Sequence, residues 1–320
     1  MTLSVRWMVT DGPHALASVV AGRIVRHRLA AVWELLGRVA EERSLRSEDV
    51  HQLRVATRRS LVAIELFADL VDSRETEWFE RQLRRIRRTA GEARDLDVLI
   101  ERLGRDLSSA KPAAAAGGRS ASAAEARERK RPQRLLAMLG RQRQSSRRPI
   151  RLLHGKLVDN DWPQRVDRLV EPLSSGGKRE FGKHARRRLA PVMRRFFRTA
   201  DRRHRDAEDL HELRIEGKKL RYALEICGVV FDARQRSRCL EAIEELQERL
   251  GDFTDHAAAA DRFGRWRRQK AARVCRDELS KLHRRESKLA DEARRAFTKW
   301  WTHRRRRELC RRFERSLGRE

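Results

Sequence analysis

The chain has 320 residues, with 76 Lys and Arg against 47 Asp and Glu, and its formal net charge is +29. This excess predicts attraction to polyanions such as nucleic acid, polyphosphate or an anionic membrane surface. The chain has no apolar run near the ~20 residues that a membrane helix needs, and its four cysteines lack the spacing of a disulfide framework. We therefore expect a cytoplasmic protein with no membrane-spanning segment.

The composition predicts an all-α fold. Pro is scarce, with 7 residues, and Ala, Leu, Arg and Glu are abundant. These residue types lose little conformational freedom in a helix. Runs of alternating β-branched residues are hard to find, so we expect almost no sheet.

The apolar periodicity predicts a series of helices along the chain. In the first half they cover about 14–42, 47–70 and 75–90, the last ended by Gly91, and a fourth starts near Asp95. Residues 108–124 are small and Gly-containing, which predicts a flexible linker, and a basic helix follows over 125–158. The second half is predicted as helices over about 178–204, 207–230 and 234–250, one from near Asp255, and a long helical region over 277–317.

Two segments 160 residues apart are similar in sequence. Residues 48–67 read EDVHQLRVATRRSLVAIELF, and residues 208–227 read EDLHELRIEGKKLRYALEIC. The same offset aligns the chain without a gap from about residue 23 to residue 98. Similarity of this length indicates two copies of one supersecondary unit. We expect the first copy over 14–107, completed by 125–158, and the second copy over 178–317.

Cations form a stripe on the most similar helix of each copy. At about 100° per residue, His51, Arg54 and Arg58 lie opposite the apolar face. The second copy repeats the stripe with His211, Arg214, Lys218 and Arg221. Neighbouring cations on a helix repel by a few tenths of a kcal/mol per pair, so a stripe that occurs twice indicates a bound anion. The alternative for each stripe is an ordinary solvated face. For Asp95 and Asp255 we expect a capping role after a C-terminal glycine.

These blocks resemble the CHAD domain, the conserved histidine α-helical domain. The resemblance rests on VHQLRVATRR and LHELRIEGKKLRYALE, each followed by a Gly and an Asp four residues apart, Gly91 with Asp95 and Gly251 with Asp255. It implies two four-helix bundles related by pseudo-twofold symmetry, with a central basic groove or pore that holds inorganic polyphosphate. Carried over by position, the implied contacts are His51, Arg54, Arg58, Arg59, His211, Arg214, Lys218, Lys219 and Arg221, with Arg28, Arg88 and Arg188 as weaker additions. Thr254 stands where the first copy has Arg94, which puts that end of the site in doubt.

These observations are compatible with three functions. The first is non-catalytic binding of inorganic polyphosphate, with recruitment to polyphosphate granules as one use of it. The second is non-specific nucleic-acid binding, but the stripes lack the interleaved aromatics of base-binding sites, and no helix-turn-helix, zinc-finger or RRM signature is visible. The third is a hydrolase of polyphosphate or a triphosphate, but the chain lacks a phosphate-binding loop and other catalytic motifs. No catalytic residue, metal ligand or cofactor is predicted, and the oligomeric state is left open.

Overall fold

The computed structural model describes residues 12–41, 46–109, 123–175, 177–202, 206–269, 273 and 275–317. Within these ranges the regular structure is helical, apart from one isolated antiparallel bridge between Leu16 and Glu180. The prediction of an all-α fold is therefore confirmed. The four cysteines are free thiols.

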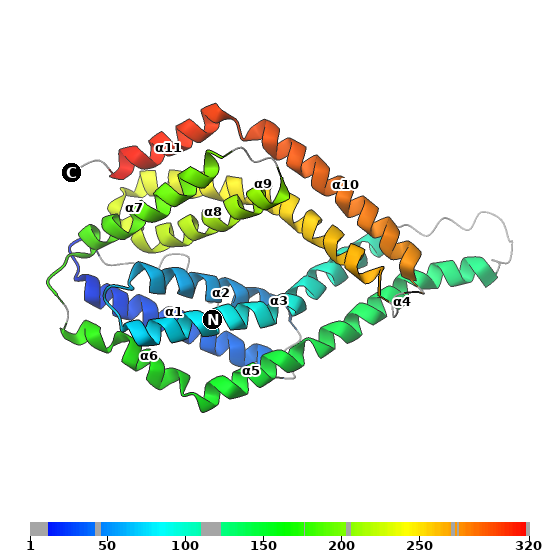
Figure 1. Ribbon diagram of the computed structural model, residues 1–320, viewed down its shortest axis with the longest axis horizontal. Helices are drawn as coiled ribbons and strands as arrows, with labels where there is room; N and C mark the ends of the chain where they lie inside the picture. Colours follow the sequence, from blue (N-terminus) through cyan, green and yellow to red (C-terminus); the bar gives the residue numbers. More distant parts are fainter. Residues whose placement is uncertain are drawn as a thin grey trace.

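The helices of the first half form the lower part of the molecule in Figure 1. They are α1 (Ala17–Ala40), α2 (Ser47–Leu66), α3 (Ser73–Ser109), α4 (Ala123–Ser145), α5 (Arg147–Asp159) and α6 (Trp162–Val170). A short 3-10 helix, η1 (Glu171–Ser175), leads toward the second half. There the helices are α7 (Phe181–Ala200), α8 (Ala207–Cys227), the 3-10 helix η2 (Gly228–Val230), α9 (Ala233–Trp266), α10 (Arg276–Trp300) and α11 (His303–Leu317).

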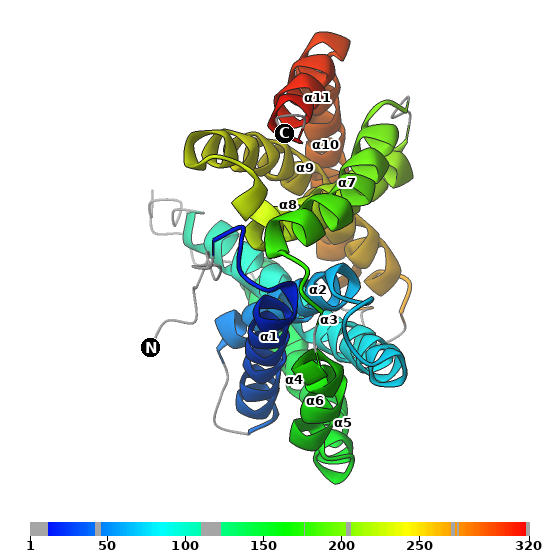
Figure 2. The same ribbon diagram turned by 90° about the vertical axis from the view of Figure 1, so that its left-hand side faces the viewer.

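The two halves meet where α2 and α8 lie side by side, in the middle of both views (Figures 1 and 2). One hydrophobic core runs through both halves and includes Leu29 and Leu53 of the first and Phe196 and Leu220 of the second, all fully buried. Because apolar burial is the main stabilising contribution to folding, this shared core ties the halves together.

A second apolar cluster joins the far ends of four helices, α3, α4, α9 and α10. Leu99 of α3, Leu139 of α4, Phe263 of α9 and Leu279 of α10 are all buried in it. These helix ends converge on the right-hand side of Figure 1. The halves are therefore held together both at α2 and α8 and at this cluster.

Two predicted helix ends are wrong, because α3 and α9 run without interruption through Gly91 and Gly251. A glycine inside a helix costs only about 1 kcal/mol relative to alanine, which tertiary packing easily offsets. Asp95 and Asp255 consequently lie inside helices, and the capping role expected for them is also wrong. Both glycines instead face an arginine of the neighbouring helix, as described below.

Other boundaries also differ from the predictions. The basic helix expected over 125–158 is two helices, α4 and α5, and the region 277–317 is divided between α10 and α11 at Trp301 and Thr302. Helix α6 was not predicted; it begins after Asp161, whose positive φ of 50° and side-chain cap turn the chain into the helix. Most of the predicted linker, residues 110–122, lies outside the described residues, and the division into repeats stays a prediction.

Candidate functional site

The apolar faces of α2 and α8 orient the two cation stripes. Leu53 and Ile64 of α2 are buried in the core, as are Leu213 and Leu220 of α8. Because residues three or four apart share one face of a helix, this burial turns the stripes away from the core. The stripes therefore lie where the N-terminal halves of α2 and α8 adjoin the middle of α3 and α9.

The cations of the two stripes gather into one group, the central basic cluster. Its members interact electrostatically across the two halves. The charge of Arg58 lowers the pKa values of His211, Arg214 and Lys218 in the other half, and the charge of Lys218 lowers the pKa of His51. Arg87 and Arg94 of α3 belong to the same group, since the charge of each lowers the pKa of Arg54. The cluster comprises His51, Arg54, Arg58, Arg87, Arg94, His211, Arg214 and Lys218.

Burial and mutual repulsion make these groups harder to protonate. Burial, followed by the charges of Arg214 and Arg58, lowers the pKa of Lys218 from its usual 10.5 to about 7. Burial and Arg58 likewise lower the pKa of Arg54 to about 10. The pKa values of His51 and His211 also lie below 6.5, because burial and neighbouring cations disfavour the imidazolium. Placing a polyanion beside the cluster would reverse this effect.

Most of the cluster has no carboxylate to balance it. In the described part of the chain, no Asp or Glu lies within ion-pair distance of Arg58, Arg87, Arg94 or Lys218, and Arg214 has only Asp255 at 3.4 Å. Cations that are partly buried without partners raise the free energy of the folded state. The arrangement is therefore one in which an external anion would be stabilising.

The glycine inside α3 makes room for one arginine of the cluster. The Arg54 guanidinium lies against α3, where its Nη1 donates to the Arg87 carbonyl oxygen at 2.8 Å. A Cβ at Gly91 would lie 3.0 Å from the same Nη1. In the other half, a Cβ at Gly251 would lie 3.9 Å from Nη2 of Arg214. Each glycine thus lets an arginine approach the helix backbone, closely at Gly91 and loosely at Gly251.

Four of the predicted contact residues are engaged in ion pairs within the protein instead. Glu225, buried on α8, is approached by Arg59 at 2.9 Å and by Arg28 and Arg221 at 3.7 Å each. We call these four side chains the Glu225 cluster. Lys219 pairs with Glu65 at 2.5 Å. The structure therefore gives Arg28, Arg59, Arg221 and Lys219 partners within the protein.

Two further predicted residues lie at the edge of the central basic cluster or beyond it. Arg188 donates from Nε to the carbonyl oxygen of Leu66 at 3.0 Å and so caps the C-terminus of α2. Arg88 is exposed and lines a cavity of about 410 Å³ between α3 and α9, which Gly91 and Asp95 also line, and its charge lowers the pKa of Arg87. The structure brings His51, Arg54, Arg58, His211, Arg214 and Lys218 together. It places Arg88 at the edge of this group and gives the other five predicted residues partners elsewhere in the protein.

The prediction missed Arg87 and Arg94 as candidate site residues. In a continuous helix, positions 87, 91 and 94 lie on one face, so this spacing would have placed both arginines beside Arg54. Interpreting Gly91 as a helix end removed that signal.

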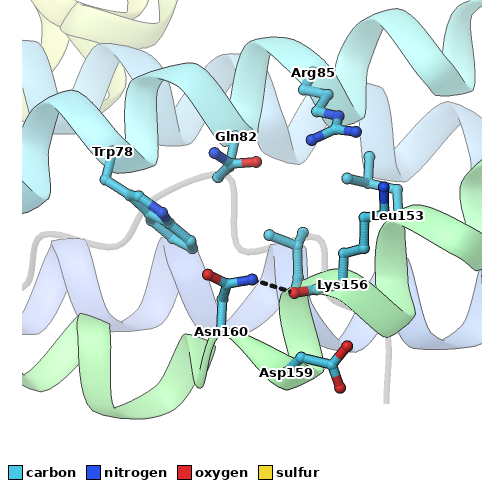
Figure 3. Close-up of a pocket in the computed structure, with 8 residues that line it drawn as sticks. Trp78, Gln82, Arg85, Leu153, Lys156, Asp159 and Asn160 are labelled. Atoms are coloured by element: carbon cyan, nitrogen blue, oxygen red, sulfur yellow. Dashed lines mark hydrogen bonds between the residues drawn. The ribbon is translucent and has the colours of Figure 1, made fainter.

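A second cavity, of about 250 Å³, lies on the outer side of the first half (Figure 3). Trp78, Gln82 and Arg85 reach it from α3, and Lys156 and Asn160 from the end of α5. Asn160 donates from Nδ2 to the Lys156 carbonyl oxygen at 2.6 Å. None of the predicted contact residues lines this cavity, so it is separate from the central basic cluster.

The described residues contain no group of three or more His, Cys, Asp or Glu side chains placed to hold a metal ion. None of the described helices combines the length and the apolar character that crossing a membrane requires.

Comparisons with known proteins give a family and several similar folds. Residues 23–264 match the family described as CHAD domain. A crystal structure of the CHAD domain from the plant Ricinus communis has a TM-score of 0.66 at 19% identity, covering 91% of this chain and 94% of that one. PptA from Streptomyces chartreusis has a TM-score of 0.57 at 16% identity, covering 90% of this chain and 99% of that one. No curated protein matches the sequence.

Proposed function

This chain belongs to the CHAD domain family, which is known for polyphosphate binding, and on that premise we propose that it binds inorganic polyphosphate at the central basic cluster without cleaving it. The observation that supports the proposal is the gathering of cations from two segments 160 residues apart, most of them without a carboxylate partner in the described residues. Phosphate oxygens would accept charge-assisted hydrogen bonds from the guanidiniums and from Lys218. A continuous groove or pore through the cluster is part of the proposal.

We also propose that the two halves are copies of one helical unit. The starts of α2 and α8, at residues 47 and 207, and of α3 and α9, at 73 and 233, differ by the same 160 residues. The ion pairs between the halves are reciprocal under that offset, since Arg59 with Glu225 corresponds to Lys219 with Glu65. Reciprocal contacts of this kind are expected across a twofold axis.

The side chains of the central basic cluster favour binding of polyphosphate over its cleavage. Hydrolysis of phosphoanhydrides normally uses carboxylates that hold a metal ion, whereas the central basic cluster is composed of cations. Nucleic acid is the second candidate ligand, favoured only by the net charge of +29. Recruitment to polyphosphate granules stays a prediction.

The proposal is tested by titrating the protein with long-chain polyphosphate and with single-stranded RNA at equal phosphate concentration. Both titrations would be run at about 50 and 200 mM salt, because released counterions weaken all phosphate contacts as salt rises. We expect polyphosphate binding to persist at the higher salt while RNA binding is lost. Equal loss of both ligands would show that the net charge acts without a shaped site. Orthophosphate released in the presence of Mg²⁺ would contradict the absence of cleavage.

A matched pair of variants tests the site itself. Replacing His51, Arg54, His211 and Arg214 together by Gln should lower polyphosphate affinity by about a hundredfold or more, since hydrogen bonds to charged groups are worth about 1.5–3 kcal/mol each. The control replaces two exposed histidines and two exposed arginines by Gln, namely His14, Arg74, Arg194 and His303. If both variants lose affinity equally, binding depends on total charge and not on the central basic cluster.

A further inference from the structure

We infer that short polyphosphate chains bind only at the first-half side of the central basic cluster, and that a chain must be longer to reach Arg214 and Lys218. This inference rests on the proposed function and specifies the chain-length preference of the same site. It comes from differences between the residues that α3 and α9 present at equivalent positions.

Helix α3 adds charge to the cluster, and α9 does not. Arg87 and Arg94 of α3 both act electrostatically on Arg54, and Arg94 also acts on His51. The equivalent residues of α9 are the uncharged Gln247 and Thr254. The Thr254 hydroxyl is buried and donates to the Leu250 carbonyl oxygen at 2.9 Å. The α9 side therefore offers no cation at the positions where α3 offers two.

The two carboxylates beside the cluster deepen this difference. Asp95 of α3 acts electrostatically on Arg54 from beyond ion-pair distance, but it is paired with Arg262 of α9 at 2.5 Å, and this cation outside the cluster balances part of its charge. Asp255 of α9 lies 3.4 Å from Arg214, and in the described residues no other cation lies within ion-pair distance of it. A phosphate at Arg214 must therefore compete with Asp255, which stays close by and repels it.

The two sides of the cluster therefore differ in the number of cations that are available to a ligand. The first-half side has the guanidiniums of Arg54, Arg58, Arg87 and Arg94, none of which has a carboxylate at ion-pair distance among the described residues. The second-half side has Arg214, already paired, and Lys218. Each charge-assisted bond is worth about tenfold in affinity or more. A chain of a few phosphates gains most by binding between α2 and α3, and a longer chain gains additional contacts at α8.

The experiment measures the binding of tripolyphosphate and of a long chain by calorimetry. The variant Arg87→Gln/Arg94→Thr gives α3 the residues that α9 carries, and we expect it to lower tripolyphosphate affinity by about tenfold or more. The control Arg74→Gln/Arg81→Thr makes the same replacements, at the same spacing, at exposed positions of α3 outside the cluster. We expect the control to change that affinity by less than about twofold, as distant exposed charges are screened.

A third variant tests the other half. Arg214→Gln should lower long-chain affinity by about tenfold or more while lowering tripolyphosphate affinity by less than about threefold. If Arg87→Gln/Arg94→Thr and Arg214→Gln lose equal amounts of tripolyphosphate affinity, the two halves are equivalent and the inference is overturned. Failure of the wild-type protein to bind either chain would instead contradict the proposed function. Circular dichroism checks that each variant is folded. If the double variant Arg87→Gln/Arg94→Thr does not fold, the single variant Arg94→Thr replaces it in the binding measurements.

Discussion

Gly91 and Gly251 occupy equivalent positions of α3 and α9, yet the arginines beside them lie at different distances. A Cβ at Gly91 would lie 3.0 Å from Arg54 Nη1, which is closer than an ordinary contact, whereas one at Gly251 would lie 3.9 Å from Arg214 Nη2. At these two sites the same substitution should therefore have the same effect on the helix and a different effect on the cluster.

Gly91→Ala should lower polyphosphate affinity by about three- to tenfold, because the Arg54 guanidinium must move and its bond to the Arg87 carbonyl is disturbed. The higher helix propensity of alanine should offset the crowding between its Cβ and Arg54, so the free energy of unfolding should change by less than about 1 kcal/mol. Gly251→Ala is the control, with an expected change in affinity below about twofold. Equal losses of affinity in calorimetric titrations would mean that the contact with Arg54 is irrelevant to binding.

Lys218 should make binding depend on pH. In the free protein its pKa is about 7, because of burial and the charges of Arg214, Arg58 and Arg54, opposed by Asp255. Bound phosphate favours the ammonium and raises this pKa. Binding then takes up a proton above pH 7, so affinity is highest below pH 7 and falls as pH rises toward the pKa of the complex, by up to about tenfold per pH unit.

Titrations in buffers of different ionisation enthalpy would count the protons taken up. Lys218→Arg supplies the control, since arginine stays charged over this range and the equivalent position, Arg58, already carries one. The variant should lose most of the pH dependence between pH 7 and pH 9. An unchanged slope would show that another group, such as His51 or His211, takes up the proton.

How far the site could be predicted depends on the distance between partners along the chain. The stripes His51, Arg54 and Arg58 and their counterparts follow from helical spacing, which local sequence determines. The partners of Arg59 and Lys219 lie on the other half of the chain, so the sequence did not indicate that these cations form ion pairs with Glu225 and Glu65. Whether they also contact the ligand stays a prediction.

At the level of elements, the contact between α2 and α8 contains two equivalent but unequal ion pairs. The Glu225 side chain is 2% exposed and is shared by three arginines, whereas the Glu65 side chain is 49% exposed and, among the residues that the structure describes, pairs only with Lys219. Removing a buried charge leaves its partners unbalanced, while exposed pairs contribute little.

Glu225→Gln should therefore lower the free energy of unfolding by about 3 kcal/mol. Glu65→Gln should lower it by no more than about 1 kcal/mol. Denaturant unfolding, with the dependence on denaturant concentration unchanged, would measure both values. Similar small losses in both variants would show that the Glu225 cluster does not stabilise the contact between α2 and α8.

The helices were predicted best where a strong apolar period coincides with a polar boundary, as for α2 at its start. They were predicted worst at Gly91 and Gly251, because a glycine that ends a helix and one that admits an arginine look alike in sequence. The divisions between α4 and α5 and between α10 and α11 also depend on tertiary packing. At the second division, the Thr302 hydroxyl accepts from the Arg305 amide at 3.3 Å to start α11.

For the whole molecule, the shared core predicts one cooperative unfolding transition. The main hydrophobic core contains buried residues of both halves, and the second cluster joins α3 and α4 to α9 and α10. Neither half can therefore unfold without exposing apolar surface of the other. Calorimetry should show a single peak whose van't Hoff and calorimetric enthalpies agree, and polyphosphate should move that peak to higher temperature. Two separated peaks would show that the halves unfold independently.

The reciprocal ion pairs between α2 and α8 also bear on how such a chain can change over evolution. In an assembly of two identical chains, every substitution appears in both partners, so an improvement on one side is imposed on the other. When both copies are joined in a single polypeptide, each position can vary alone. Arg94 and Thr254, which occupy equivalent places and differ in charge, illustrate that freedom. Under the proposed duplication, covalent linkage allows one copy to specialise while the other preserves the contact that holds the pair together.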